Sequence, residues 1–354
     1  MIRPTRLLPA TDPAALDEAA RVLHAGGLVA FPTETVYGLG ADAMNPVAVA
    51  GIFAAKGRPA TNPLIVHGHD INEVRQVVSA WPHRAAILAQ RFWPGPLTLV
   101  LPRAPLVPDA VTAGLDTVGI RIPDCDAALQ LLRTFGRPIA APSANRSTGV
   151  SPTTAGHVLA DLDGRIDLIL DGGPTRVGIE STVLDLTGDP PRLLRPGAIT
   201  ATQIGQVLGV VVSVTSVAKA MDTPMRSPGQ MEVHYAPRAS VCLLEPDEVS
   251  SEPRPDRGKT ALIVAGHRVL PTPGVYDERV DWTDPTSAAL ELYATLHRWD
   301  DESIDRIDVV LPPDDDAWRA VRDRLWRASR RWAREGLPAS PSRQDETHPA
   351  LDSK

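Results

Sequence analysis

Cysteine and long apolar runs are nearly absent from this chain of 354 residues. The two cysteines, Cys125 and Cys242, are too few and too far apart for a disulfide scaffold or a cysteine-rich zinc site. No apolar run approaches the ~20 residues that a membrane-spanning helix needs. The N-terminal stretch also lacks the apolar segment of a secretory signal. These absences predict a soluble, reduced protein of the cytoplasm that makes no contact with membranes.

Several catalytic motifs are absent as well. Nothing matches the P-loop pattern GxxxxGKS/T, the GxSxG elbow or the HExxH zinc motif, and no Cys/His nucleophile pair has supporting spacing. His67-Gly68-His69 resembles a metal pair but has no apparent third ligand, so we predict no metal held directly by the protein. The chemistry therefore points to positioning and charge stabilisation, as in nucleotidyl transfer.

Charge is unevenly distributed along the chain, which carries a net charge of -7. Residues 1–239 hold 20 acidic and 20 basic residues, whereas residues 240–354 hold 23 acidic and 16 basic ones. A neutral first part followed by an acidic second part predicts two domains. It also argues against a general nucleic-acid coat, which is normally basic.

Apolar runs and helical patterns in the first part follow no clean βαβα repeat. Helices are expected at 12–27, 45–56, 70–80 and 83–92, with a further one starting at Ser151-Pro152. Strands are expected at 28–31, 64–67, 97–102, 118–123, 138–142, 166–170, 181–186 and 192–195. The order predicts an α/β fold with an open twisted mixed sheet and flanking helices over residues 1–212.

The second part has a different organisation. Residues 213–238 have no clear period and are rich in Ser, Thr, Pro and Met, which is typical of a linker. Strands near 241–245, 260–265 and 306–312 alternate with helices near 286–299 and 316–334, which predicts a smaller parallel, Rossmann-like αβ domain over 239–335. Residues 336–354 are expected to be a disordered tail.

Lys56 is the main candidate for phosphate chemistry. It is the only lysine in the first 218 residues, although arginine serves nearly everywhere else. Lys56 and Arg58 lie two apart in a Gly/Pro turn, so both could reach one phosphate chain. The alternative is that Lys56 only complements the dipole at a helix C-terminus.

Two loops and two arginines are further candidates. PTETVYGLG (32–40) follows a buried strand, where ligands usually bind in α/β folds, although it could be an ordinary turn. APSANRSTGVSPTT (141–154) leads from a strand into a helix, an arrangement that suits anions. Arg121 and Arg195 lie in apolar strand-like runs, where each is either structurally paired or directed at an anionic ligand.

Together these segments resemble one family. PTETVYGLGA (32–41), KGRP with NPLIVH (56–67), APSAN (141–145), SPTTA (151–155), IESTVLDL (179–186) and LLRPG (193–197) are similar to the YrdC-like domain of L-threonylcarbamoyladenylate synthases. SPGQMEVHYAP (227–237) resembles the linker of the two-domain form. The segment 312–318 departs from the family pattern, so the resemblance implies no functional residues in the C-terminal part.

The resemblance implies a reaction. L-threonine, bicarbonate (or CO2) and ATP, normally with Mg2+, would give L-threonylcarbamoyl-AMP and pyrophosphate. The product would supply the N6-threonylcarbamoyl group of adenosine 37 in tRNAs that read ANN codons, through a separate tRNA threonylcarbamoyl-transferase complex. A weak contact with tRNA itself is also expected.

The resemblance also implies site residues. Lys56 and Arg58 would stabilise charge on the reacting phosphates. The full set implied to bind ATP is Lys56, Arg58, Asn62, Thr117, Ser143, Asn145, Ser151, Arg195, His234 and Tyr235. The set implied around threonine is Thr33, His67, Arg121, Ala141 and Ser181. His234 and Tyr235 would close over the nucleotide from the linker as a lid.

Two alternatives remain open from the sequence. One is a tRNA- or rRNA-binding protein of the same fold, against which the balanced charge of residues 1–239 argues. The other is hydrogenase-maturation carbamoyl transfer, for which the accompanying zinc-finger cysteines are missing.

Overall fold

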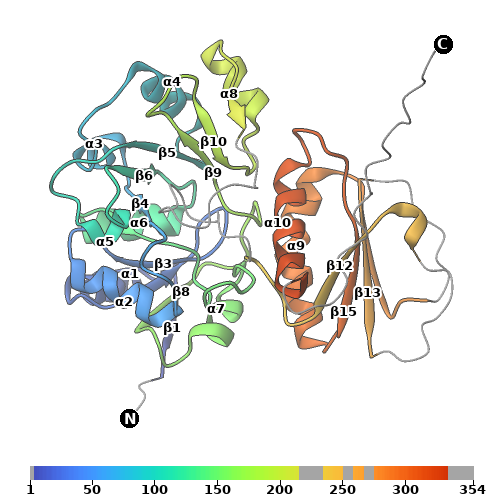
Figure 1. Ribbon diagram of the computed structural model, residues 1–354. Coiled ribbons are helices and arrows are strands. Elements are labelled where there is room, and N and C mark those ends of the chain that lie inside the picture. The colour runs from blue at the N-terminus through green and yellow to red at the C-terminus, as the bar shows by residue number, and fades with distance from the viewer. Residues whose placement is uncertain (1–3, 215–233, 250–257, 267–274, 334–354) are drawn as a thin grey trace, which may run out of the picture.

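The computed structural model describes residues 4–214, 234–249, 258–266 and 275–333. Two bodies lie side by side, the first built on an 11-stranded sheet and the second on a 4-stranded sheet (Figure 1). Within these described ranges no helix is long and apolar enough to cross a membrane. The mixed α/β fold class and the parallel second sheet expected from the sequence are confirmed.

The large sheet is mixed, with the strand order β1-β8-β2-β3-β7-β4-β6-β5-β9-β10-β11. Its strands are β1 (Arg6–Pro9), β2 (Val29–Phe31), β3 (Gly38–Asp42), β4 (Ile65–His67), β5 (Leu97–Pro102), β6 (Thr117–Arg121), β7 (Ile139–Ala140), β8 (Leu168–Asp171), β9 (Thr182–Asp185), β10 (Arg192–Arg195) and β11 (Ser213–Val214). β4 runs parallel to β6 and pairs His67 with Arg121, so two candidate residues end neighbouring strands together.

Helices cover this sheet and begin where the sequence supplies caps. They are α1 (Pro13–His24), α2 (Pro46–Lys56), α3 (Ile71–Gln76), α4 (His83–Phe92), α5 (Asp109–Thr112), α6 (Asp126–Phe135), α7 (Ala155–Leu162) and α8 (Ala201–Leu208). Asn45 caps α2 by accepting from the amides of Val47 and Ala48, and Gly57 ends it in the left-handed conformation. This sharp stop places Lys56 and Arg58 at the start of the candidate loop.

Two expectations about the site loops are wrong. Gly38–Asp42 forms strand β3, not part of a loop, and pairs with β2 and β7. A Cβ at Gly40 would lie 2.8 Å from Ile139 and Phe31. Glycine is therefore used there for close packing. Ser151-Pro152 does not start a helix: α7 begins at Ala155, where the Thr154 hydroxyl accepts from the His157 amide.

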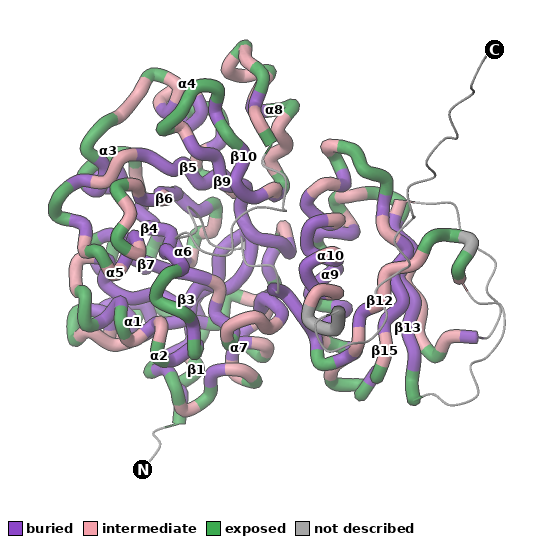
Figure 2. The backbone as a smooth tube through the Cα atoms, in the orientation of Figure 1, coloured by how far each residue is buried: buried purple, intermediate pink, exposed green. Residues whose placement is uncertain are grey.

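The second body is a parallel sheet with two long helices on one face (Figures 1 and 2). Its order is β12-β15-β13-β14, from β12 (Ser240–Leu244), β13 (Thr260–Ala265), β14 (Glu278–Trp282) and β15 (Arg306–Val310). The helices are α9 (Pro285–Asp301) and α10 (Arg319–Ala333), and a short 3-10 turn spans Pro246–Glu248. Most of the expected linker and the expected tail lie outside the described residues.

Helices α9 and α10 lie between the small sheet and the first body (Figure 1). One apolar cluster joins the two bodies: it contains Val36, Val150 and Ile179 from the first and Leu292 and Tyr293 from the second. The second body therefore packs directly behind the loops that carry the candidate site.

Gly178 permits this close approach. Its φ is +83°, and a Cβ there would lie 2.5 Å from the Leu290 Cα and still closer to the Ala289 carbonyl oxygen. We expect Gly178→Ala to lower the free energy of unfolding by clearly more than the roughly 1–2 kcal/mol that a positive φ costs a non-glycine residue. Gly173→Ala is the matched control, since Gly173 has φ +78° and nothing within 4 Å of a Cβ. Equal losses in urea melts of the two variants would show that Gly178 is not a close contact between the bodies.

A histidine pair crosses the same interface. The rings of His157 on α7 and His297 on α9 stack with centroids 3.8 Å apart. Burial, followed by the neighbouring His297 ring, lowers the pKa of His157 to about 4, and burial also lowers the pKa of His297. Both rings are therefore neutral in the folded protein at neutral pH.

This pair predicts a loss of stability in mild acid. Because the folded pKa values are depressed, the unfolded chain takes up protons first, so the free energy of unfolding falls from about pH 6.5 toward pH 4. We expect His297→Gln to flatten that slope in urea melts taken across this range. The exposed His83→Gln variant is the control, and an equal slope in all three proteins would contradict the assignment.

Candidate active site

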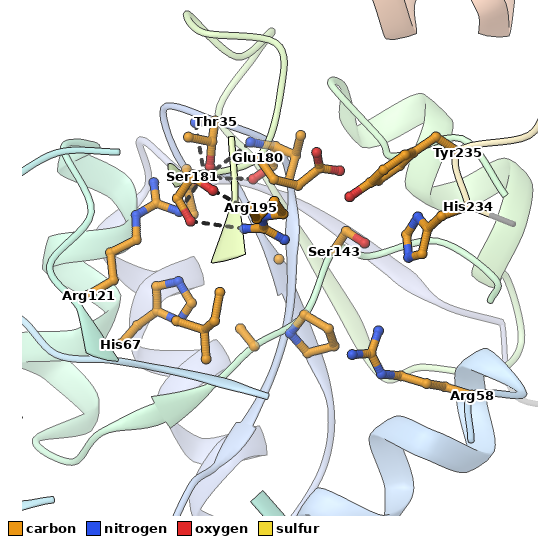
Figure 3. Close-up of a pocket in the computed structure, with 16 residues that line it drawn as sticks. Thr35, Arg58, His67, Arg121, Ser143, Glu180, Ser181, Arg195, His234 and Tyr235 are labelled. Atoms are coloured by element: carbon orange, nitrogen blue, oxygen red, sulfur yellow. Dashed lines mark hydrogen bonds between the residues drawn. The ribbon is translucent and has the colours of Figure 1, made fainter. Parts of the chain in front are cut away.

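A pocket opens in the first body at the ends of β2, β4, β6 and β9, and His234 and Tyr235 close one side of it (Figure 3). The lining residues are Thr33, Thr35, Val36, Gly38, Arg58, Ile65, His67, Arg121, Ala141, Pro142, Ser143, Glu180, Ser181, Arg195, His234 and Tyr235. Ten predicted site residues are among them. The enclosed volume is about 40 Å3.

Three arginines give the pocket its electrostatic character: Arg58, Arg121 and Arg195 are each at most 8% exposed. Arg58 follows the left-handed Gly57 and donates from Nη2 to the carbonyls of Asn62 (3.4 Å) and Pro63 (3.1 Å). Its Nε is buried without a hydrogen-bond partner, and no described carboxylate lies within 4.0 Å of its guanidinium. Burial lowers the pKa of Arg58 to about 10, which leaves it charged at neutral pH.

Arg195 and Ser181 form one unit. Arg195 at the end of β10 donates from Nε to the Ser181 carbonyl and from Nη2 to the Ser181 hydroxyl, both at 3.0 Å. The Ser181 hydroxyl lies 2.8 Å from that of Thr98 on β5. These bonds fix the position of both side chains on the pocket wall (Figure 3).

Arg121 already has an acidic partner that the sequence interpretation missed. Its Nη2 lies 2.7 Å from Oε2 of Glu34, and both side chains are at most 4% exposed. It also donates to the Thr35 hydroxyl (3.0 Å) and the Gly95 carbonyl (3.2 Å). The glutamate in the Thr-Glu-Thr segment (33–35) was the one feature of the sequence that pointed to this partner. Glu34 therefore already balances the charge of Arg121.

Lys56 does not line the pocket. Its ammonium donates to the carbonyls of Ser143 (2.5 Å) and Asn145, and it lies 3.4 Å from the Asn145 side-chain oxygen. Burial, followed by the charge of Arg58, lowers the pKa of Lys56 well below its usual range. In this structure Lys56 holds the loop that begins at Ser143 in place.

The other predicted residues outside the lining are Asn62, Thr117, Asn145 and Ser151. Asn145 braces the same loop, donating to Gly149 (2.8 Å) and accepting from the Ser143 hydroxyl (2.6 Å). The Ser151 hydroxyl instead donates to Oε1 of Glu180 at 2.5 Å. Thr117 starts β6 and is half-buried, whereas Asn62 is 1% exposed.

Buried polar atoms without hydrogen-bond partners gather here. Among the described residues they include both amide atoms of Asn62, Nδ1 of His67 and His234, and the Tyr235 hydroxyl. Buried polar groups without a hydrogen-bond partner are rare, and such groups are commonly completed by a ligand, an ion or water. Burial, with Arg121, lowers the pKa of His67 to about 3, so His67 offers a neutral ring to a ligand.

No group of three or more His, Cys, Asp or Glu side chains that could hold a metal ion occurs in the described parts of the chain. The pocket offers hydroxyls and one carboxylate, Glu180. Because the Glu180 oxygens already accept from Ser151, Tyr293 and Arg324, a Mg2+ ion would be held mainly by substrate phosphates and its own waters.

Comparisons with known proteins agree on the family. A family model described as "Telomere recombination" matches residues 21–197, and one described as "Threonylcarbamoyl-AMP synthase, C-terminal domain" matches residues 199–330. A threonylcarbamoyl-AMP synthase from Bacillus subtilis is 43% identical over 91% of this chain and 94% of its own length. The Pyrococcus abyssi one is 51% identical over 64% of this chain and 67% of its own length.

A solved structure agrees as well. The crystal structure of Pyrococcus abyssi Sua5 complexed with L-threonine is similar with a TM-score of 0.78 and 41% identity, covering 89% of this chain and 94% of the other. The chain therefore belongs to the threonylcarbamoyl-AMP synthase family in its two-domain form.

Proposed function

We propose that this protein makes L-threonylcarbamoyl-AMP and pyrophosphate from L-threonine, bicarbonate or CO2, and ATP, which makes it a nucleotidyltransferase. The observation that carries the proposal is Arg58, a buried cation that lines the pocket with no carboxylate partner among the described residues. A buried charge is costly unless it is paired, so an anionic ligand completes the site. Arginine binds phosphate oxygens with short, charge-assisted bonds.

The reaction places specific demands on the pocket. The threonine amine forms an N–C bond with the carbon of CO2, or of bicarbonate with loss of water. A carbamate oxygen then forms a bond to the α-phosphorus of ATP, and the bond from that phosphorus to pyrophosphate breaks. Negative charge grows on phosphate oxygens, where Arg58 and Arg195 stabilise it.

The two substrates are assigned to two sides of the pocket. We place threonine near Thr33, His67, Arg121, Ala141 and Ser181, where Arg121 offers a bidentate contact to its carboxylate. We place ATP near Arg58, Ser143, Arg195, His234 and Tyr235. Asn62 and Thr117, which lie outside the lining, would contact ATP once the pocket has widened. Lys56, Asn145 and Ser151 then act by holding the loops in position.

The pocket must widen to admit ATP, because about 40 Å3 is far below the roughly 300 Å3 of a typical ligand site. His234 and Tyr235 form its movable side in our proposal, and they close again to keep water from the adenylate. Mg2+ would enter with ATP and neutralise phosphate charge. We also propose a cytoplasmic location, transfer of the product to a separate tRNA threonylcarbamoyl-transferase complex, and at most a weak tRNA contact.

Pyrophosphate release tests this function. The protein incubated with ATP, Mg2+, L-threonine and bicarbonate should release pyrophosphate, and omitting either threonine or bicarbonate should abolish the release. Omission of bicarbonate requires degassed buffer, since dissolved CO2 is a substrate. Release that does not depend on threonine would refute the proposal.

A further inference from the structure

Glu180 is the one acidic side chain among the pocket-lining residues that the structure describes. It precedes Ser181 at the start of β9, it is 5% exposed, and its carboxylate is directed toward the side of the pocket closed by Tyr235 (Figure 3). Burial raises its pKa, but the charges of Arg324 and Arg195 outweigh burial and hold the pKa at about 2. Glu180 is thus a fixed negative charge in the wall of a pocket for an anion.

The counter-charge to Glu180 comes from the second body. Arg324 on α10 is fully buried, and its Nε donates to Oε2 of Glu180 at 3.0 Å. Tyr293 on α9 donates its hydroxyl to the same carboxylate at 3.0 Å. Arg324 also donates from Nη1 to the Pro196 carbonyl and to Asp323, both at 2.9 Å.

Arg324 also reaches the pocket wall in a second way. Its guanidinium lies over the Tyr235 ring, 5.1 Å from the centroid, and that ring is 5.6 Å from Tyr293. Arg324 thus contacts both Glu180 and Tyr235, and these two residues in turn line the pocket. Arg324 itself does not line the pocket.

We propose that Arg324 is a positioning residue that keeps the ATP site receptive by neutralising Glu180, so that the C-terminal domain supplies the counter-charge to the acidic side chain of the nucleotide pocket. Without Arg324, the Glu180 carboxylate would repel the phosphates of ATP and draw on the positive charge of Arg195. This inference rests on the proposed function and gives the C-terminal domain a role in substrate binding.

Arg324→Gln and Arg324→Lys separate charge from packing. Glutamine keeps a hydrogen-bond donor for Glu180 but removes the charge, whereas lysine keeps the charge. We expect Arg324→Gln to raise the Kd and KM for Mg2+-ATP about tenfold to a hundredfold, because the Glu180 carboxylate would then repel the phosphates without a counter-charge. Arg324→Lys should stay much closer to the unmodified protein, and the KM for threonine should change much less than that for ATP.

The same Arg324→Gln change made in a Glu180→Gln background is the decisive control. With the carboxylate removed, loss of the counter-charge should no longer affect ATP binding. The doubly substituted variant should fold, because Asp323, the other carboxylate bonded to Arg324, keeps its ion pair with Arg327 at 3.0 Å. An equal loss of ATP affinity in both backgrounds would overturn the proposal, as would similar losses in the Gln and Lys variants.

Calorimetric titration with Mg2+-ATP distinguishes a failure of the proposed function from a failure of the role given to Arg324. Failure of the unmodified protein to bind ATP would refute the proposed function itself. Binding that is unaffected by Arg324→Gln would refute only the role of Arg324.

Discussion

Replacing Arg58 by methionine is expected to lower kcat/KM for ATP by about 10²–10³-fold, the usual cost of removing one preorganised donor to a developing charge. Methionine keeps much of the side-chain volume and removes the charge. Because Arg58 has no carboxylate partner among the described residues, its loss leaves no opposite charge unpaired. The free energy of unfolding should therefore not fall by more than about 1 kcal/mol, because removing an unpaired buried charge offsets the loss of the hydrogen bonds to the Asn62 and Pro63 carbonyls.

This combination of lost activity and kept stability is the signature of a ligand-directed charge. Arg165→Met is a suitable control, since Arg165 is exposed and is not one of the pocket-lining residues. Urea melts and pyrophosphate assays on both variants make the comparison. A loss of several kcal/mol in Arg58→Met, or full activity, would mean that Arg58 is structural.

Arg121→Met should behave in the opposite way. It leaves the Glu34 carboxylate, 2% exposed, without its partner at 2.7 Å, and such uncompensated buried charges cost about 3–5 kcal/mol. We expect the free energy of unfolding to fall by that amount in urea melts. The KM for threonine should rise strongly as well, since the guanidinium that would hold its carboxylate is gone.

A double variant separates these two effects. Adding Glu34→Gln to Arg121→Met removes the unpaired charge and should restore most of the lost stability. Threonine saturation should remain impaired, because the carboxylate contact is still missing. Recovery of threonine binding together with stability would show that Arg121 acts only through the fold.

The sequence predicted the helices and strands best where apolar runs and caps agree. Asn45 and Gly57 mark both ends of α2, and LTLVLP becomes β5 over the expected residues. The sequence-based prediction failed at β3, because Gly38 and Gly40 suggested a loop, whereas in the structure they leave room for the Phe31 ring. A local pattern does not reveal which residues a glycine must fit against.

The candidate site shows the same division. Ten of the residues implied by the family resemblance line the pocket, whereas the sequence did not indicate which side chains form ion pairs with Arg121 and Glu180. Glu180 and Arg324 are 144 residues apart, and Glu34 and Arg121 also meet only through the sheet. Long-range pairs of this kind leave no periodic signal. Lys56 drew attention as an isolated lysine, and the structure shows its ammonium bonded to loop carbonyls.

The synthesis of threonylcarbamoyl-AMP is tested most directly by following the carbon atom of bicarbonate into the product. The protein is incubated with L-threonine, Mg2+-ATP and either ordinary or 13C-labelled bicarbonate, and the nucleotide products are analysed by mass spectrometry. Threonylcarbamoyl-AMP should form in step with pyrophosphate, and its mass should rise by one unit with the labelled bicarbonate. Threonine-dependent AMP or ADP without any labelled carbamoyl product would contradict this prediction.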